Sequence, residues 1–295
     1  MSMFTFNTQK TIIICLFLTV PLLLLLVFTY YSAYYLLFLS FTSWDGTSLV
    51  KKFVGLENFK TIFTNPQIFK VFLHNFAYFF VGLFQMGMAL YLAIILNGKI
   101  RGRNFFKSLI FMPYIMNSVA VAFMFGYLFR FEDGAINLLL HKIGLSFLAM
   151  NWLGDVEIVN YALASVTTWK HMGLFVVIFI GALQSIPQDI YEAAELDGAG
   201  SFQLFRYITF PSMITIIELA LFLNLAGSLS IFEFPFILTK GGPIGASDTF
   251  VTKTVDTAFV FNSYGLASAM GIVLIVIVII LALLQRAILH RNGDS

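Results

Sequence analysis

The chain has 295 residues, of which 59% are hydrophobic and only 11% are charged, and its formal net charge is +2. A soluble domain usually carries about a quarter charged residues, so this composition leaves too little polar surface for a water-soluble body, and we expect lipid to cover the remainder. The near-neutral charge gives no indication of nucleic-acid binding, and the single cysteine, Cys15, excludes an internal disulfide framework and a cysteine-built metal site.

Six apolar stretches are long enough to cross a bilayer as helices. A hydrocarbon core of about 30 Å needs about 20 helical residues at about 1.5 Å each, and only helices or closed barrels can span lipid. The stretches lack the alternation of barrel strands and cover residues 11–41, 71–97, 107–130, 159–184, 211–238 and 266–289. We therefore predict an all-α, polytopic membrane bundle of six transmembrane helices.

The first stretch, residues 11–41, follows Lys10 in the manner of a signal peptide. It is longer than a signal-peptide core and no small-residue cleavage site ends it, so we expect an uncleaved first span. We accordingly divide the chain into a first transmembrane helix with its extracytoplasmic loop, residues 1–70, and a core of five transmembrane helices, residues 71–290.

The short loop between the second and third stretches predicts the orientation. Residues 97–107 carry four basic side chains and no acidic one, namely Lys99, Arg101, Arg103 and Lys107. Such loops are retained on the cytoplasmic side of the membrane. Alternation of the six spans then places both termini and residues 185–211 in the cytoplasm, and residues 42–70, 131–158 and 239–265 outside.

The segment between the fourth and fifth stretches, residues 185–211, has the local chemistry of a short helix outside the bilayer. Ser185 is a candidate N-cap, and Pro187 suits the first turn. Gly198 and Gly200 are candidates for its end.

This helix has features that suit a partner protein. Ala193 and Ala194 give it a slim face, and Glu192, Glu195 and Asp197 give it charge for pairing. An ordinary surface helix between two spans has the same local chemistry, so these residues alone leave the partner open.

The spacing of this segment resembles the EAA loop of ABC importer permeases. The matching residues are Glu192, Ala193 and Ala194, then after three residues Gly198, after nine more Ile208, and after one more Phe210 and Pro211. The family has Leu where this chain has Phe210, which is another bulky apolar residue. Residues 238–243, Leu-Thr-Lys-Gly-Gly-Pro, are similar to a turn of maltose-type (MalF-like) sugar permeases, and the resemblance covers about residues 70–290.

The resemblance implies the permease subunit of an ATP-driven sugar importer in a prokaryotic cell membrane, with no enzymatic activity of its own. In that family the loop is a coupling helix that docks on the ATPase, and the implied docking residues are Glu192, Ala193, Ala194, Asp197 and Gly198. The implied partners are a second, similar permease, two cytoplasmic ATP-binding subunits and an extracytoplasmic sugar-binding protein. The sequence has no Gly-x4-Gly-Lys-Ser/Thr phosphate loop, so we expect ATP and Mg²⁺ to be bound by the partner ATPase and no cofactor in this chain.

Polar residues within the fourth and fifth stretches are candidates for sugar contacts, because polar groups at membrane depth usually face a cavity or another helix. Alignment with the maltose-type permeases indicates Thr167, Lys170, His171, Leu174, Asn224, Gly227, Ser228 and Ile231, and Glu233 is a further polar candidate. Asn224, Ser228 and Ile231 are four and three residues apart and share one helix face. Asn75, Tyr78 and Gln85 on the second stretch are additional candidates.

Other interpretations of these residues remain open. Lys170 and His171 could extend to the outer interface, or Lys170 could pair with Glu233 and hold two helices together. The same architecture could import another solute, such as glycerol phosphate or a polyamine, although no arginine lies clearly within a span. An ion-coupled transporter with Glu218 and Glu233 as a proton relay, or an assembly factor without transport activity, are the remaining alternatives.

Overall fold

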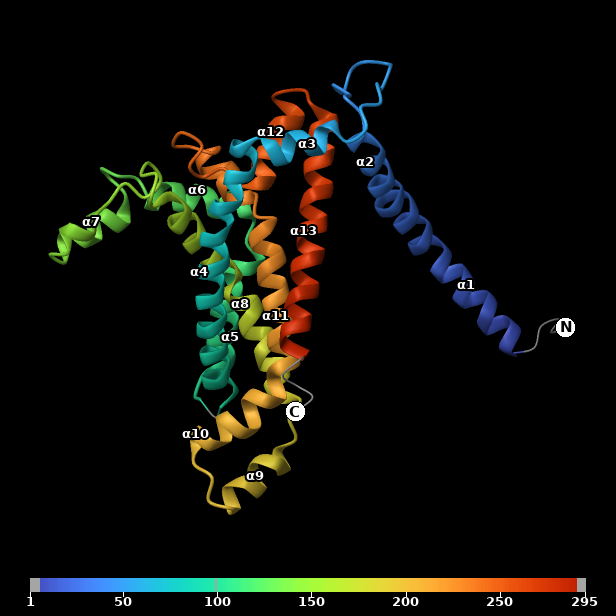
Figure 1. The fold of residues 1–295 in the computed structure, drawn as a ribbon. Helices are drawn as coiled ribbons and strands as arrows, with labels where there is room; N and C mark the ends of the chain where they lie inside the picture. Colours follow the sequence, from blue (N-terminus) through green and yellow to red (C-terminus); the bar gives the residue numbers. More distant parts are fainter. Residues whose placement is uncertain (1–5, 99, 291–295) are drawn as a thin grey trace. The chain divides into compact units, whose positions relative to one another are not determined.

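The structure is a computed structural model that describes residues 6–98 and 100–290 (Figure 1). Lys99, one of the basic residues that predict the orientation, lies outside the described residues. The chain forms two compact units, and within the described residues the first comprises 6–65 and 254–275 and the second comprises 66–253 and 276–290. The division after residue 70 that the sequence suggests concerns membrane organisation and stays a prediction.

The first unit contains the first apolar stretch and the loop that follows it. α1 (Phe6–Leu25), a π-helical turn (Leu26–Tyr31) and α2 (Ser32–Ser40) form one continuous helical run, of which Ile13–Ser40 is long and apolar enough to cross a membrane. The loop leads to α3 (Glu57–Thr64) and is fixed by Asn58 Nδ2, which donates to the carbonyl oxygens of Ser40 and Thr42, at 2.8 Å each. This ordered connection ends the first span where the sequence predicts.

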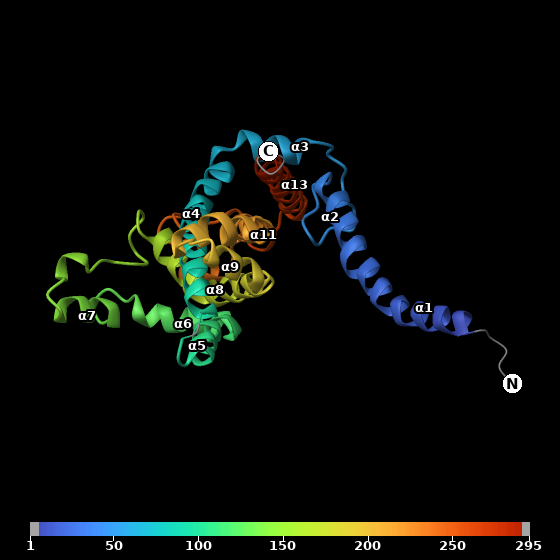
Figure 2. The same ribbon diagram turned by 90° about the horizontal axis from the view of Figure 1, so that it is seen from below.

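Within the described residues, eight α-helices lie wholly in the second unit. They are α4 (Pro66–Asn97), α5 (Arg103–Ile115), α6 (Ser118–Leu128), α7 (Ala135–Lys142), α8 (Val159–Gln184), α9 (Gln188–Leu196), α10 (Ser201–Leu204) and α11 (Phe210–Leu229), with π-helical turns at Phe205–Thr209 and Pro235–Thr239. α12 (Phe250–Phe259) and α13 (Tyr264–His290) are each divided between the two units. α4 packs against α8 and α11, as the two views of the ribbon show (Figures 1 and 2).

Small side chains allow these helices to approach closely. Ala89 and Ala93 of α4 and Ala220 of α11 are fully buried in one cluster with Phe179 of α8. Small residues at a membrane helix interface let backbones pack tightly, because lipid supplies no hydrophobic driving force between helices. The cluster therefore holds α4, α8 and α11 as a rigid group, on which the candidate site is built.

Five helices within the described residues are long and apolar enough to cross a membrane, and the pair of α5 and α6 passes the same test together. The third predicted stretch, residues 107–130, is thus a broken helix rather than a straight one, since α5 and α6 are bent by 97°. Met116 is extended at the break, and the Asn117 side chain caps α6 by accepting from the Val119 N–H at 2.8 Å. The apolar composition of this stretch hides the break from sequence analysis.

The bent pair still completes a crossing. α4 and α8 run in the same direction, because Tyr78 shares a buried cluster with Leu163, and further along both helices Gln85 Nε2 donates to the Thr168 carbonyl at 3.1 Å. The chain between them must return from the end of α4 to the start of α8, and α5 and α6 make that return. This agrees with the predicted bundle of six crossings.

The fifth predicted stretch, residues 211–238, is also interrupted. α11 ends at Leu229, and residues 230–232 are not helical. Asn75 Nδ2 of α4 donates to the Ser228 carbonyl at 2.6 Å, so it satisfies a helix-end acceptor that the chain itself leaves open. Pro235, which has no N–H to donate, begins the next helical turn. Asn75 therefore has a structural role at the end of α11.

Candidate functional site

The segment after α8 forms the predicted short helix, α9, which has no buried residues. Its end is a Schellman motif, in which the Gly198 N–H donates to the Glu195 carbonyl at 3.0 Å and the Ala199 N–H donates to the Ala194 carbonyl at 2.9 Å. Gly198 has φ +87°, a conformation that suits glycine because it has no Cβ. The prediction that Gly198 ends this helix is confirmed.

Three other predictions about this helix were wrong. Ser185 does not cap α9, because its hydroxyl donates to the Ala182 carbonyl and Ser185 ends α8 instead. Pro187 occupies the N-cap position of α9, one residue before its first turn. Gly200 does not end α9 either, since it has φ −77° and precedes α10 as its N-cap.

α9 is held against the base of α11 on one side and is open on the other. Tyr191 OH lies 3.0 Å from Thr209 Oγ1, which directly precedes α11. The five residues predicted to dock on a partner lie on the accessible part of this segment, and only Ala194 among them is half-buried; the others are Glu192, Ala193, Asp197 and Gly198. A force applied to α9 would therefore reach α8 through three connecting residues and α11 through the Tyr191 contact.

A cavity of about 520 Å³, here called the central cavity, lies among α4, α8, α11 and the chain that follows α11. Eight of the nine candidates on the fourth and fifth stretches line it, namely Thr167, His171, Leu174, Asn224, Gly227, Ser228, Ile231 and Glu233. Tyr78 and Gln85 from the second stretch line it as well. Lys170 and Asn75 are not among its lining residues.

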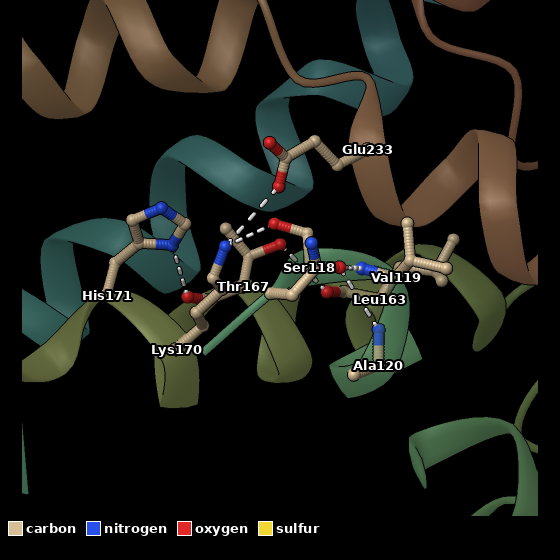
Figure 3. A network of polar contacts seen from close by, with 9 residues as sticks. Ser118, Val119, Ala120, Leu163, Thr167, Lys170, His171 and Glu233 are labelled. Atoms are coloured by element: carbon tan, nitrogen blue, oxygen red, sulfur yellow. Dashed lines mark hydrogen bonds and ion pairs between the residues drawn. The ribbon is translucent and has the colours of Figure 1, made fainter. Parts of the chain in front are cut away.

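Lys170 points instead to the junction of α5 and α6 (Figure 3). Its ammonium group contacts Ser118 Oγ and forms an ion pair with Glu233 Oε2 at 3.7 Å. The Lys170 side chain is only 9% exposed and that of Glu233 is 52% exposed. The alternative in which Lys170 pairs with Glu233 is confirmed, and Lys170 does not extend to an outer interface.

The lining of the central cavity is rich in hydrogen-bond acceptors. Thr167 Oγ1 and Ser228 Oγ donate to helix carbonyls of Leu163 and Leu225, at 3.1 and 2.9 Å, which leaves lone pairs on both oxygens. His171 Nδ1 lies 2.9 Å from the Thr167 carbonyl (Figure 3), and because a carbonyl only accepts, Nδ1 carries the proton. The neutral ring then has an acceptor at Nε2. Such a lining suits a ligand that brings many donors.

Asn224 has a fixed position on the wall of the cavity. Its Nδ2 donates to the Phe79 carbonyl of α4 at 3.2 Å. Gly82 lies opposite, and a Cβ added there would come within 1.9 Å of Asn224 Oδ1. Only glycine at position 82 therefore leaves room for this amide, which joins α4 and α11 at the cavity.

Tyr78, an additional candidate from the second stretch, also lines the central cavity. Its hydroxyl is buried, and no hydrogen-bond partner for it occurs in the part of the chain that the structure describes. The sequence signal was its spacing, since Tyr78, Gly82 and Gln85 are four and three residues apart and share one face of α4. Tyr78 offers the cavity an aromatic ring together with a hydroxyl group.

No group of three or more His, Cys, Asp or Glu side chains that could hold a metal ion occurs within residues 6–98 and 100–290. The central cavity has polar groups suited to hydrogen bonding, and its one carboxylate, that of Glu233, is paired with Lys170.

Comparison with known proteins gives consistent matches. A family model described as binding-protein-dependent transport system inner membrane component matches residues 85–293. The chain is 35% identical to the probable ABC transporter permease protein YurN of Bacillus subtilis, over 97% of this chain and 99% of that protein. It is 32% identical to the multiple sugar-binding transport system permease protein MsmF of Streptococcus mutans, over 91% of this chain and 92% of that protein.

The fold has a counterpart among solved structures. A chain of a bacterial alginate ABC transporter, in complex with a periplasmic protein that holds an alginate pentasaccharide, is similar with a TM-score of 0.82. The two chains are 22% identical, and the match covers 98% of each.

Proposed function

We propose, because this chain belongs to the family of binding-protein-dependent transport system inner membrane components, that it is the permease subunit of an ATP-driven importer for a neutral sugar or oligosaccharide. The observation that carries the sugar assignment is the acceptor-rich central cavity. Sugars present several hydroxyl donors and an apolar C–H face. The acceptors of Thr167, His171 and Ser228 suit the first, and the ring of Tyr78 suits the second.

The charges at the cavity support a neutral substrate. Glu233 is the one acidic residue of the lining, and its carboxylate is paired with Lys170. No Lys or Arg is among the lining residues, so an acidic sugar or a phosphate ester would find no cation facing it. This argues against glycerol phosphate.

The geometry does not favour a proton relay through Glu218 and Glu233. Glu233 is paired with Lys170 beside the central cavity, whereas Glu218 lines a separate cavity with Arg286. The two cavities have no lining residue in common within the described chain, so the two carboxyl groups do not form one path.

The energy for transport enters through α9 in this proposal. Glu192, Ala193, Ala194, Asp197 and Gly198 dock on a cytoplasmic ATPase, which binds ATP and Mg²⁺, while this chain has no catalytic role. A rigid helix in a cleft transmits a rigid-body motion to the spans it follows. The importer comprises a second permease, two ATP-binding subunits and an extracytoplasmic sugar-binding protein, in a cell membrane with both termini of this chain inside. The inward-open and outward-open states must bind the sugar differently for ATP to drive import.

The test is uptake by the assembled importer in proteoliposomes that contain ATP, with maltose, sucrose and cellobiose as radiolabelled probes supplied with the binding protein. We expect ATP-dependent uptake of at least one of these neutral sugars. Asn224→Ala combined with Ser228→Ala is expected to lower that uptake about tenfold or more, because each hydrogen bond contributes about 1 kcal/mol.

A serine on the same helix provides the control. Ser212 of α11 is exposed and lies outside the central cavity, so Ser212→Ala should leave uptake unchanged. Normal uptake in the Asn224 and Ser228 double variant would refute the site, and absence of ATP-dependent uptake of every neutral sugar tested would count against the function.

A further inference from the structure

A second cavity of about 520 Å³, here called the end cavity, lies where α4 and α8 begin. It is lined by residues of α4, the start of α8, the loop after α11 and the start of α12, namely Gln67, Lys70, Val71, His74, Val156, Asn160, Pro243, Ile244, Gly245, Ala246, Asp248 and Lys253. It has no lining residue in common with the central cavity among the residues that the structure describes. Its volume is within the range of sites that bind small molecules, about 300–1,000 Å³.

The two cavities follow one another along the same helix faces. On α4, His74 of the end cavity is four residues before Tyr78 of the central cavity. On α8, Asn160 of the end cavity is four residues before Ala164 of the central cavity. Residues four apart share a helix face and differ by about 6 Å along the axis. The end cavity therefore begins one helical turn from the central cavity, on the side away from α9.

Asn160 provides an acceptor that the chain does not satisfy. Its side chain is buried, with 8% exposed, and its Nδ2 donates to the Ala246 carbonyl at 2.8 Å. Its Oδ1 is buried without a hydrogen-bond partner in the described part of the chain. A buried acceptor in this state favours a ligand that brings a donor.

His74 provides a second acceptor on the opposite helix. Its Nδ1 lies 2.7 Å from the Asp248 carbonyl, and because that oxygen only accepts, Nδ1 carries a proton. In the neutral form of the ring, Nε2 is then an acceptor. The end cavity, like the central one, thus suits a ligand rich in hydroxyl groups.

The loop that covers the end cavity is internally fixed. Thr239 Oγ1 lies 2.7 Å from Ser247 Oγ, which in turn donates to the Gly242 carbonyl at 2.5 Å. Ile244 has φ +50°, which is unfavourable for a β-branched residue and persists only where the surroundings fix it. The walls are therefore preformed before a ligand arrives.

A layer of buried side chains separates the two cavities. Tyr78 and Phe234 line the central cavity, Ala246 lines the end cavity, and all three belong to one buried cluster. A ligand in the end cavity would pass this layer to reach the central cavity.

We propose that the end cavity is a second sugar site, which holds one sugar ring through Asn160 Oδ1 and His74 Nε2 before that ring enters the central cavity. This inference rests on the importer function proposed above. It adds a binding step on the side from which the sugar is delivered, and it assigns that step to residues of α4 and α8 outside the transport site.

The test uses protection of a cysteine from a maleimide in the assembled importer, without the binding protein. Val156 lines the end cavity and is exposed, so Val156→Cys with Cys15→Ser supplies a single reactive thiol. With maltose, sucrose or cellobiose at about ten times its Kd, we expect the labelling rate to fall about tenfold, because only the empty site reacts. Leu49→Cys, at a nearly fully exposed position in the other unit, should label at one rate with or without sugar.

Further variants identify the source of the protection. Asn160→Leu should remove the protection. If Asn160→Leu impairs assembly of the importer, His74→Leu replaces it and should weaken the protection. Asn224→Ala with Ser228→Ala should leave it intact, because those residues belong to the central cavity.

Three results would overturn the end site while the importer function stands. The first is normal uptake of a sugar that gives no protection of Val156→Cys. The second is protection that is lost in the Asn224 and Ser228 double variant, which would place the effect at the central cavity. The third is protection only by the sugar-loaded binding protein, which would make the end cavity a docking surface for that protein.

Discussion

At the scale of single residues, the buried ammonium group of Lys170 is the charge beside the site that most needs a partner. A cation at membrane depth is expensive, and here its charge is balanced by the Glu233 carboxylate at 3.7 Å and by contact with Ser118 Oγ. Because Glu233 is half exposed, solvent screens part of the attraction. The pair joins α8 to the chain after α11, and it keeps the ammonium group away from the central cavity.

Removal of one partner should therefore be costlier than removal of both. We expect Glu233→Gln to lower stability by about 1 kcal/mol, since it leaves Lys170 buried without a counter-charge. Lys170→Met added to Glu233→Gln should recover much of that loss in a double-mutant cycle measured by thermal unfolding of the purified protein. The exposed pair Arg130 and Asp133, at 3.1 Å, is the control, and Asp133→Asn should have little effect. Equal losses at both sites would show that burial of Lys170 does not matter.

At the scale of elements, the backbone conformation at the end of α9 fixes how rigidly this proposed docking helix is held. Gly198 adopts φ +87°, whereas Gly200, two residues on, has φ −77° and is free of close contacts. Gly198→Val should cost about 1–2 kcal/mol locally, because a Cβ clashes in the left-handed region, and the Schellman motif should be lost. Gly200→Ala fits its backbone conformation and should be tolerated.

We expect Gly198→Val to abolish sugar-stimulated ATP hydrolysis in the assembled importer while the chain still inserts into the membrane. Gly200→Ala should retain that activity, and Glu192→Lys should behave like Gly198→Val if the charge pairs with the ATPase. Full stimulated hydrolysis in Gly198→Val would refute the docking role of α9.

The elements also mark what could be predicted from the sequence. The lengths of the apolar stretches predicted the spans. Helical spacing predicted that Asn224, Ser228 and Ile231 share one helix face, and all three line the central cavity. The breaks after Met116 and Leu229 were not predicted, because the apolar composition of a stretch does not indicate where a helix ends inside the membrane. The first break has a local cap, in which Asn117 accepts from the Val119 N–H. The second depends on a donor from α4, which is a tertiary contact.

Lys170, which the alignment indicated, does not line the central cavity, again because of packing. Lys170 is adjacent in sequence to His171, and alignment cannot tell which of two neighbours faces a cavity when the cavity is made by other helices. Ser118 lies at the bend between α5 and α6, and the Lys170 ammonium group contacts its hydroxyl. A cavity formed by three helices becomes visible only when their packing is known.

At the scale of the whole molecule, the length of α4 and the two loops at its ends make the membrane orientation testable. This helix has 32 residues and is about 48 Å long, enough to cross the bilayer completely. Its start lies beside the loop that carries Ile244, because both line the end cavity. Its end leads into the basic loop that carries Arg101. These two loops must therefore lie on opposite sides of the membrane, whichever way the chain is inserted.

We expect single-cysteine chains in a Cys15→Ser background to separate these sides. In intact cells treated with a membrane-impermeant maleimide, Ile244→Cys should label, since Ile244 is fully exposed, and Arg101→Cys should label only after the membrane is permeabilised. The physical reason is that basic loops are retained in the cytoplasm. The reverse pattern would overturn the predicted orientation and move α9 away from any cytoplasmic ATPase. Labelling of both positions from one side would refute α4 as a complete span.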